Sequence, residues 1–141
     1  MATVNSTTYA AQLAGTISLS QGEGNATLHC ITTTYEASAA AANTVINLFK
    51  LPKGVVIQNF VVAHDDVGTG VTVDIGDEGD IDRYVDGLSL STSAGSTMGC
   101  LVDGIGYVIG TDAEHDDTLV TAKILGSSAT GTIKVVCYYS M

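Results

Sequence analysis

The hydrophobic residues of this chain occur in short runs, and each run is bounded by Gly, Ser, Thr, Asn or Asp. Outside one Ala-rich segment, no window keeps the apolar spacing i, i+3, i+4 and i+7 that an amphipathic helix needs. β-Branched residues are frequent within the runs, and turn-forming residues separate them, as in short antiparallel strands. The pattern therefore predicts an all-β fold, a single-domain antiparallel β-sandwich of jelly-roll type.

The run at residues 55–63 is almost continuously apolar, which is typical of a strand covered on both faces, so we place it at the centre of the core. The Ala-rich segment at 35–42 predicts a turn of helix at most. Strands are expected at 16–20, 26–35, 44–51, 55–63, 71–75, 98–109, 118–125 and 130–139.

The chain has 141 residues, a length that suits one domain with its own core. Residues 1–15 are small and polar, with Tyr9 as their aromatic residue, and they lack a clear periodicity. We therefore expect an extended N-terminal arm at 1–15, ordered only where something receives it, and a β-sandwich domain at 16–141.

The charge of the chain excludes several classes of partner. Five basic and fifteen acidic residues give a net charge of -10, which repels nucleic acid and anionic membranes. No apolar run is long enough to span a membrane, and the N-terminus lacks the pattern of a secretion signal, so we expect synthesis in a cytoplasm. Only 14% of the residues are charged, and a surface of small neutral groups suits packing against other subunits.

Acidic residues concentrate between positions 65 and 86, where Arg83 is the one basic residue. The centre of this segment resembles a calcium loop, because hard cations bind carboxylate oxygens on a flexible backbone. Its order does not match the EF-hand pattern, and Asp and Gly also form tight turns for backbone reasons. We interpret the segment as a turn in which Arg83 pairs with Asp80, Asp82 or Asp86. Cation binding is the alternative, with candidate ligands Asp77, Asp80 and Asp82.

The tripeptide His-Asp-Asp occurs at 64–66 and again at 115–117. Imidazole beside carboxylates can ligate zinc or form part of a hydrolytic site. Neighbouring side chains on a strand point to opposite faces, however, so capping of strand ends explains both copies more simply. The sequence has no nucleophile elbow, P-loop, dinucleotide fingerprint or HExxH motif, and we expect no catalytic residue, no cofactor and no enzyme activity.

The cysteines and the tyrosines are candidates for the core and for contacts between subunits. The three cysteines, Cys30, Cys100 and Cys137, have no ligand-like spacing, and we expect buried free thiols. The candidate interface residues are Tyr9, Arg83 and Tyr138, since aromatic and Arg side chains are frequent contacts between subunits. One tyrosine of the pair 138–139 is expected in the core.

The stretches at 51–66, 70–77 and 80–87, followed by 118–124, resemble a pattern that recurs in small head proteins of tailed bacteriophages, of the decoration or cement kind. The resemblance covers roughly residues 44–125 and leaves out the N-terminal segment and the Ala-rich segment. It implies a jelly-roll that binds the major capsid protein of the shell, often as a homotrimer, in virions assembled in the host cytoplasm. It implies no catalytic residues.

The sequence thus predicts a capsid decoration protein that bridges capsomers on the outside of the head. A second hypothesis is another virion part, such as a head-fibre base, a tail component or a minor capsid protein, because the same fold serves each. A third is a cation-dependent carbohydrate-binding module that uses residues 74–86.

Overall fold

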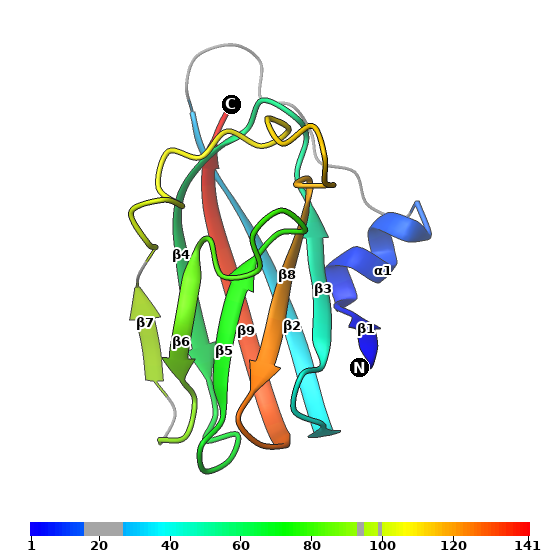
Figure 1. Cartoon of the computed structure of the whole chain (residues 1–141), viewed down its shortest axis with the longest axis vertical. Coiled ribbons are helices and arrows are strands. Elements are labelled where there is room, and N and C mark those ends of the chain that lie inside the picture. Colours follow the sequence, from blue (N-terminus) through cyan, green and yellow to red (C-terminus); the bar gives the residue numbers. More distant parts are fainter. Residues whose placement is uncertain (16–26, 93–94, 99) are drawn as a thin grey trace.

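The computed structural model describes residues 1–15, 27–92, 95–98 and 100–141, and strands dominate it (Figure 1). The strand expected at 16–20 lies outside the described residues. The elements are β1 (Thr3–Asn5), α1 (Thr7–Leu13), β2 (Leu28–Ala40), β3 (Val45–Lys50), β4 (Val56–His64), β5 (Thr72–Gly76), β6 (Val85–Ser89), β7 (Gly95–Met98), β8 (Leu119–Leu125) and β9 (Ala129–Ser140).

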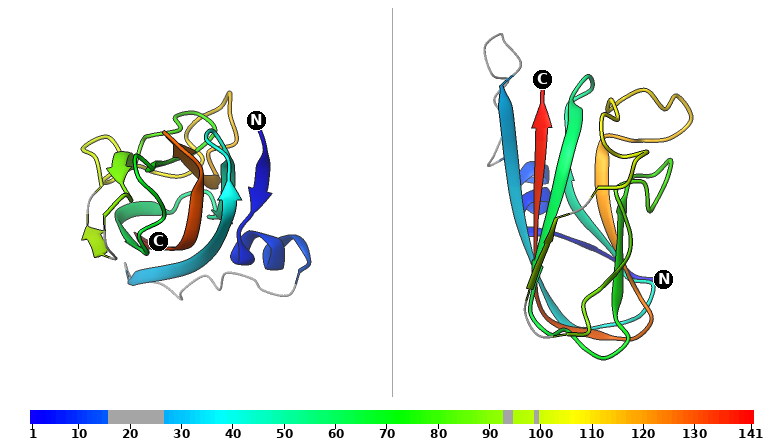
Figure 2. Two further views of the ribbon diagram at one scale, coloured as in Figure 1. Left: turned by 90° about the horizontal axis from the view of Figure 1, so that it is seen from below. Right: turned by 90° about the vertical axis from the view of Figure 1, so that its left-hand side faces the viewer.

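The strands form two sheets, one of order β2-β9-β4-β7 and one of order β1-β3-β8-β5-β6. Without β1, the eight strands β2 to β9 have the order of a jelly roll, and each pairs antiparallel with its neighbours. The antiparallel β-sandwich predicted from the sequence is confirmed. The β3–β4, β5–β6 and β7–β8 connections meet at one end of the sandwich, where β2 begins and β9 ends (Figures 1 and 2). We call this end, with residues 51–55, 77–84 and 100–118, the loop end.

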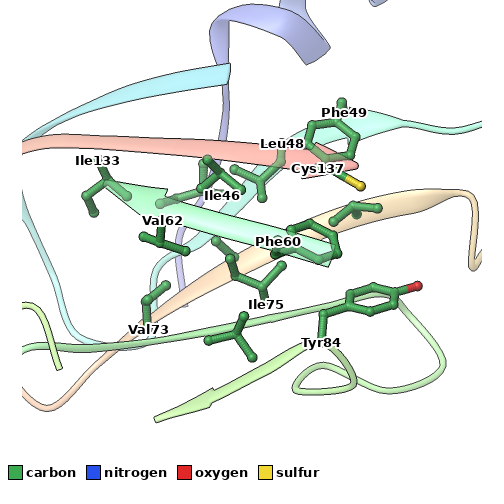
Figure 3. Packing of buried hydrophobic residues seen from close by; sticks show 14 of the residues in the cluster. Ile46, Leu48, Phe49, Phe60, Val62, Val73, Ile75, Tyr84, Ile133 and Cys137 are labelled. Carbon is green, nitrogen blue, oxygen red and sulfur yellow. The ribbon is translucent and has the colours of Figure 1, made fainter. Parts of the chain in front are cut away.

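The core lies between the two sheets because alternate residues of each strand point inward. On β4 the inward residue Ile57 is buried. Phe60 and Val62 on the same strand and Val73 and Ile75 on β5 are also buried (Figure 3). The central place predicted for 55–63 is therefore confirmed. The outward residues of β4 are partly exposed, so only one face of this strand is covered, contrary to expectation.

Two expected elements are wrong. The Ala-rich segment does not form a turn of helix, because β2 extends to Ala40 and pairs with β9. Residues 100–109 do not form the strand expected at 98–109, and a set of turns takes its place. Gly104 and Gly106 explain these turns. A Cβ on Gly104 would lie 2.8 Å from the carbonyl oxygen of Arg83, and Gly106 has a φ of +81°.

The N-terminal segment is ordered by the chain itself, which corrects the expected arm. β1 pairs in parallel with the edge of β3. Helix α1 then lies beside β2 and β3, so this segment covers that side of the sandwich (Figure 2). Ser6 caps the N-terminus of α1. Its side chain accepts the N–H of Tyr9 and donates to the carbonyl of Leu48.

Candidate functional site

A buried ion pair holds the β5–β6 connection at the loop end. The carboxylate of Asp77 is fully buried, and its Oδ2 accepts from Arg83 Nε at 2.8 Å and from the Tyr84 hydroxyl at 3.0 Å. Its Oδ1 accepts from Arg83 Nη2 at 3.1 Å and from the backbone N–H groups of Gly79 and Asp80 at 3.0 Å. A buried carboxylate needs such partners, and here every one of them comes from the same loop.

Arg83 and Tyr84 connect this loop to the core and to the β7–β8 connection. The ring of Tyr84 stacks on Phe60 with centroids 4.9 Å apart. The guanidinium carbon of Arg83 lies 3.9 Å from the centroid of the Tyr107 ring, a cation–π contact. The Tyr107 hydroxyl donates to buried Asp117 at 2.8 Å. We call these five residues the loop brace: Asp77, Arg83, Tyr84, Tyr107 and Asp117.

The loop brace is built to hold structure. Burial, then the neighbouring Asp77 carboxylate, raises the pKa of Tyr84 far above its ordinary value. Burial also raises the pKa of Tyr107. Both phenols therefore stay protonated and act as hydrogen-bond donors at neutral pH. Asp117 also accepts the N–H groups of Gly110 and Asp112. It thereby fixes the turns at 110–117, in the last part of the β7–β8 connection.

The β7–β8 connection is also tied to the strands by its backbone. The N–H of Ile57 donates to Tyr107 at 2.9 Å, and the N–H of Gly106 donates back to Ile57 at 2.8 Å. The N–H of Leu101 donates to Tyr84 at 2.9 Å. Glu78 accepts the N–H of Asp116 at 2.9 Å. This long connection is therefore fixed at several points along its length.

Arg83 pairs with a different aspartate from the ones that the sequence predicted. The expected partners were Asp80, Asp82 or Asp86, and the observed partner is Asp77. Asp80 instead accepts the N–H of Asp82, and this neighbour, followed by burial, raises the pKa of Asp80. Among the described residues, no group of three His, Cys, Asp or Glu side chains is placed to hold a metal ion. The cation-dependent hypothesis thus has no ligand set in this part of the chain.

The two His-Asp-Asp tripeptides lie at opposite ends of the sandwich, so they form no common site. His64 ends β4, and its Nδ1 lies 2.8 Å from the carbonyl oxygen of Asp65. His115 is in the β7–β8 connection, with its Nδ1 3.3 Å from Asp112 Oδ2. The aspartates of both copies accept backbone N–H groups, as the capping interpretation expects.

The three candidate interface residues lie apart. Tyr9 is half-buried on α1, and Arg83 is engaged in the loop brace with 14% of its side chain exposed. Tyr138 is half-buried on β9, opposite Cys30 and Asn59 on the outer face of the sheet. It lines a hollow of about 300 Å³ with Leu28, Gln58, Asn59 and Val61. Tyr139 is in the core, as expected of one tyrosine in the pair.

The cysteines differ in burial more than the sequence suggested. Cys137 is buried and Cys100 is half-buried, whereas Cys30 is exposed, and all three are free. Cys30 is exposed because it lies on the outward face of β2. Its expected burial was therefore wrong.

Sequence reasoning missed the exposed apolar side chains of the loop end. The apolar pattern predicts a strand for Leu101, Val102 and Ile105, yet all three are exposed in the turns of this connection. The glycines at 104 and 106 are the signal that could have identified these turns, because glycine weakens a strand interior.

Within the described residues, no helix has the length and apolar character to span a membrane.

No protein-family model matches the sequence, and no curated protein resembles it in sequence. Solved structures resemble it in fold. A chain from the capsid of Ralstonia phage GP4 superposes with a TM-score of 0.72 and 19% identity, over 99% of this chain and 98% of that one. A chain from the capsid asymmetric unit of cyanophage Pam1 gives a TM-score of 0.62 and 18% identity, over 89% and 91% of the two chains. The chain therefore shares its jelly-roll fold, over nearly its whole length, with chains of two bacteriophage capsids.

Proposed function

We propose that this chain is a structural protein of a bacteriophage virion that decorates the outside of the head and stabilises the shell by bridging capsomers. The observation that carries the proposal is the match to the phage GP4 capsid chain, which covers 99% of this chain and 98% of that one. Both chains are matched almost end to end, so the likeness extends over the jelly roll and the N-terminal segment together.

The charge of the chain supports a place on the outer surface. With a net charge of -10, the protein is repelled by packaged DNA, which lines the inside of a filled head. The loop brace supports a mechanical role, because its charged and phenolic groups bond to one another and hold the loops in place.

The partners in this proposal are the major capsid protein and two further copies of this chain, as a homotrimer. Stabilisation follows from repetition. Many contacts of modest affinity act together on one lattice, so a subunit that releases one contact stays held by the others.

Heads that lack the protein provide the test. Such heads are purified from a phage in which the gene is deleted and are mixed with the purified protein before and after head expansion. We expect saturable binding and greater resistance of the bound heads to heat. Absence of saturable binding to both forms would refute the proposal.

The alternative is a different virion part, such as a head-fibre base, a tail component or a minor capsid protein. The fold match does not favour one over the other, because the matched chains come from a capsid and from a capsid asymmetric unit, and the fold alone assigns no place in the virion. Copy number separates the two: quantitative mass spectrometry of virions should give hundreds of copies for a decoration protein and about a dozen or fewer for a vertex or tail part.

A further inference from the structure

Exposed apolar side chains are concentrated at the loop end. Among the described residues, nine large hydrophobic side chains are exposed. Five belong to the loops of this end: Ile81, Leu101, Val102, Ile105 and Val108. Leu28 and Met141 lie at the same end of the sandwich, at the start of β2 and just after the end of β9. A patch of this kind on one end of a small domain marks an interaction surface.

Carboxylates occur in the same loops as these apolar side chains. Exposed or half-exposed acidic side chains in the same loops are Glu78, Asp80, Asp82, Asp103, Asp112, Glu114 and Asp116. The nearby lysines and arginine do not balance these seven carboxylates, since Arg83 is bound to the buried Asp77 and only Lys50, bound to Asp116 at 3.3 Å, and the exposed Lys53 remain. The loop end therefore combines exposed apolar side chains with an excess of carboxylates.

We infer that the loop end docks on a partner protein whose surface offers apolar and basic side chains. The inference rests on the proposed function, in which that partner is the capsid shell. Charge complementarity decides against the other occupants: two copies that met through this end would bring like charges together, and nucleic acid would meet the same repulsion.

The loop end is prepared for docking. Its turns are held by the loop brace and by the backbone bonds from Ile57 to Tyr107 and from Leu101 to Tyr84. Val102, at 90% exposure, projects from a turn closed by the N–H groups of Gly104 and Ile105, which both donate to Leu101. Because the loops are already ordered, binding costs little conformational entropy.

A hollow extends the patch onto the outer face of the sheet. Leu28, Val61 and Tyr138 line this space of about 300 Å³. Leu28 belongs to both the hollow and the patch, so the two surfaces are continuous. A partner side chain that enters the hollow would add apolar burial next to the loop contact.

The test uses the full-length protein and heads that lack it. The double variant Val102→Ser and Ile105→Ser removes apolar groups from two exposed positions, and Asp103→Lys reverses a charge beside them. We expect the double variant to bind at least ten-fold more weakly. Asp103→Lys should bind several-fold more weakly at low salt, with a smaller difference at high salt.

Matched controls lie outside the loops of the loop end. Leu13→Ser removes an apolar side chain that is 62% exposed on α1, and Asp66→Lys reverses a charge at the opposite end of the sandwich. Both should bind as the native chain does. Unchanged near-ultraviolet dichroism verifies that each variant is folded, and Ile81→Ser, on a different loop, repeats the test independently.

Each result has one meaning. If the native chain does not bind heads, the proposed function fails and the shell is not the partner. If it binds and the loop-end variants bind equally well, the function stands and this docking surface is refuted. If light scattering shows that Val102→Ser with Ile105→Ser dissociates an oligomer of the free protein, the occupant is a second copy, and the inference is also refuted.

Discussion

The side chain of Gln12 pairs with the backbone of Lys50 as another strand residue would. Its Oε1 accepts the Lys50 N–H at 2.8 Å, and its Nε2 donates to the Lys50 carbonyl at 3.1 Å. β1 pairs with β3 only as far as Asn47, so this contact continues the pairing to the end of β3. A helix residue thereby satisfies two backbone groups at the edge of a sheet.

Removal of this contact should destabilise the fold modestly. Gln12→Ala leaves both backbone groups of Lys50 to water, and we expect the free energy of unfolding to fall by about 1 kcal/mol in urea titrations. Gln58→Ala is the control, because Gln58 is exposed and its side chain bonds to Ser140 only through Nε2. A control as damaging as Gln12→Ala would contradict the special role of Gln12.

Ser6 should matter more than its size suggests. Ser6→Ala removes the cap of α1 and the bond to the Leu48 carbonyl from a residue that is 1% exposed. We expect a loss of about 1–2 kcal/mol in the free energy of unfolding. Thr7→Ala, at an exposed neighbour with one 3.3 Å bond, should cost clearly less, and equal losses would argue against the cap.

Loss of either partner of the buried ion pair should be severe. Asp77→Ala leaves Arg83 and the Tyr84 hydroxyl without their buried partner. We expect the free energy of unfolding to fall by about 3 kcal/mol and the melting temperature by roughly 10 °C. Arg83→Ala should act in the same direction, because it leaves Asp77 buried without its cation. Lys50→Ala breaks an exposed pair with Asp116 and should cost less than about 1 kcal/mol. Calorimetry distinguishes these outcomes.

Acid should weaken the loop end first. The pKa of Asp112 is lowered chiefly by the backbone N–H of Glu114, and that of Asp116 by the Thr118 hydroxyl. Burial opposes ionisation of Asp117, but its hydrogen bonds outweigh burial and lower its pKa as well. A folded pKa below the ordinary 3.8 means that these groups stabilise the fold above that pH and lose this effect as the pH falls through the lowered values.

Urea titrations between roughly pH 7 and pH 2 measure this effect. We expect the free energy of unfolding to fall below about pH 5, and Asp117→Asn to flatten the decline. Asp80→Asn is the control of opposite sign. The pKa of Asp80 is raised, so its ionisation opposes folding as the pH rises, and Asp80→Asn should not flatten the acid decline.

The three thiols should react in order of burial. Cys30 is exposed and should be alkylated first in the native protein. Burial raises the pKa of Cys100 to about 11 and raises that of Cys137 further, which suppresses the reactive thiolate in both. Mass spectrometry after timed iodoacetamide treatment measures the order. Rapid native labelling of Cys137 would contradict the burial of β9's inner face.

The elements that the sequence predicts well are those whose burial repeats along the strand. β4 follows from a nearly continuous apolar run and β9 from a run of β-branched and aromatic residues, and the two ends of β8 agree with the expected strand within one residue. Helix α1 could not be found in this way, because contacts from Ser6 and Gln12 to β3 hold this short helix and its own periodicity does not.

The loop end was harder to predict because its interactions join distant parts of the chain. Asp77 is six residues from Arg83, farther than the neighbours considered, and the loop folds back to bring them together. Tyr107 joins them only through the tertiary fold. The apolar residues at 101–108 favour a strand by propensity, but the glycines at 104 and 106 allow the backbone to form turns there.

The three-residue length of β1 has a consequence for crowded copies of this protein. A long, flat edge strand is a template on which identical chains can grow into fibrils. At the side where β1 lies, the sheet ends in a strand that passes into a helix after Asn5, so an incoming chain would find almost no backbone to copy. The N-terminal segment thus acts as a terminator of sheet growth and protects this flank from amyloid-like stacking.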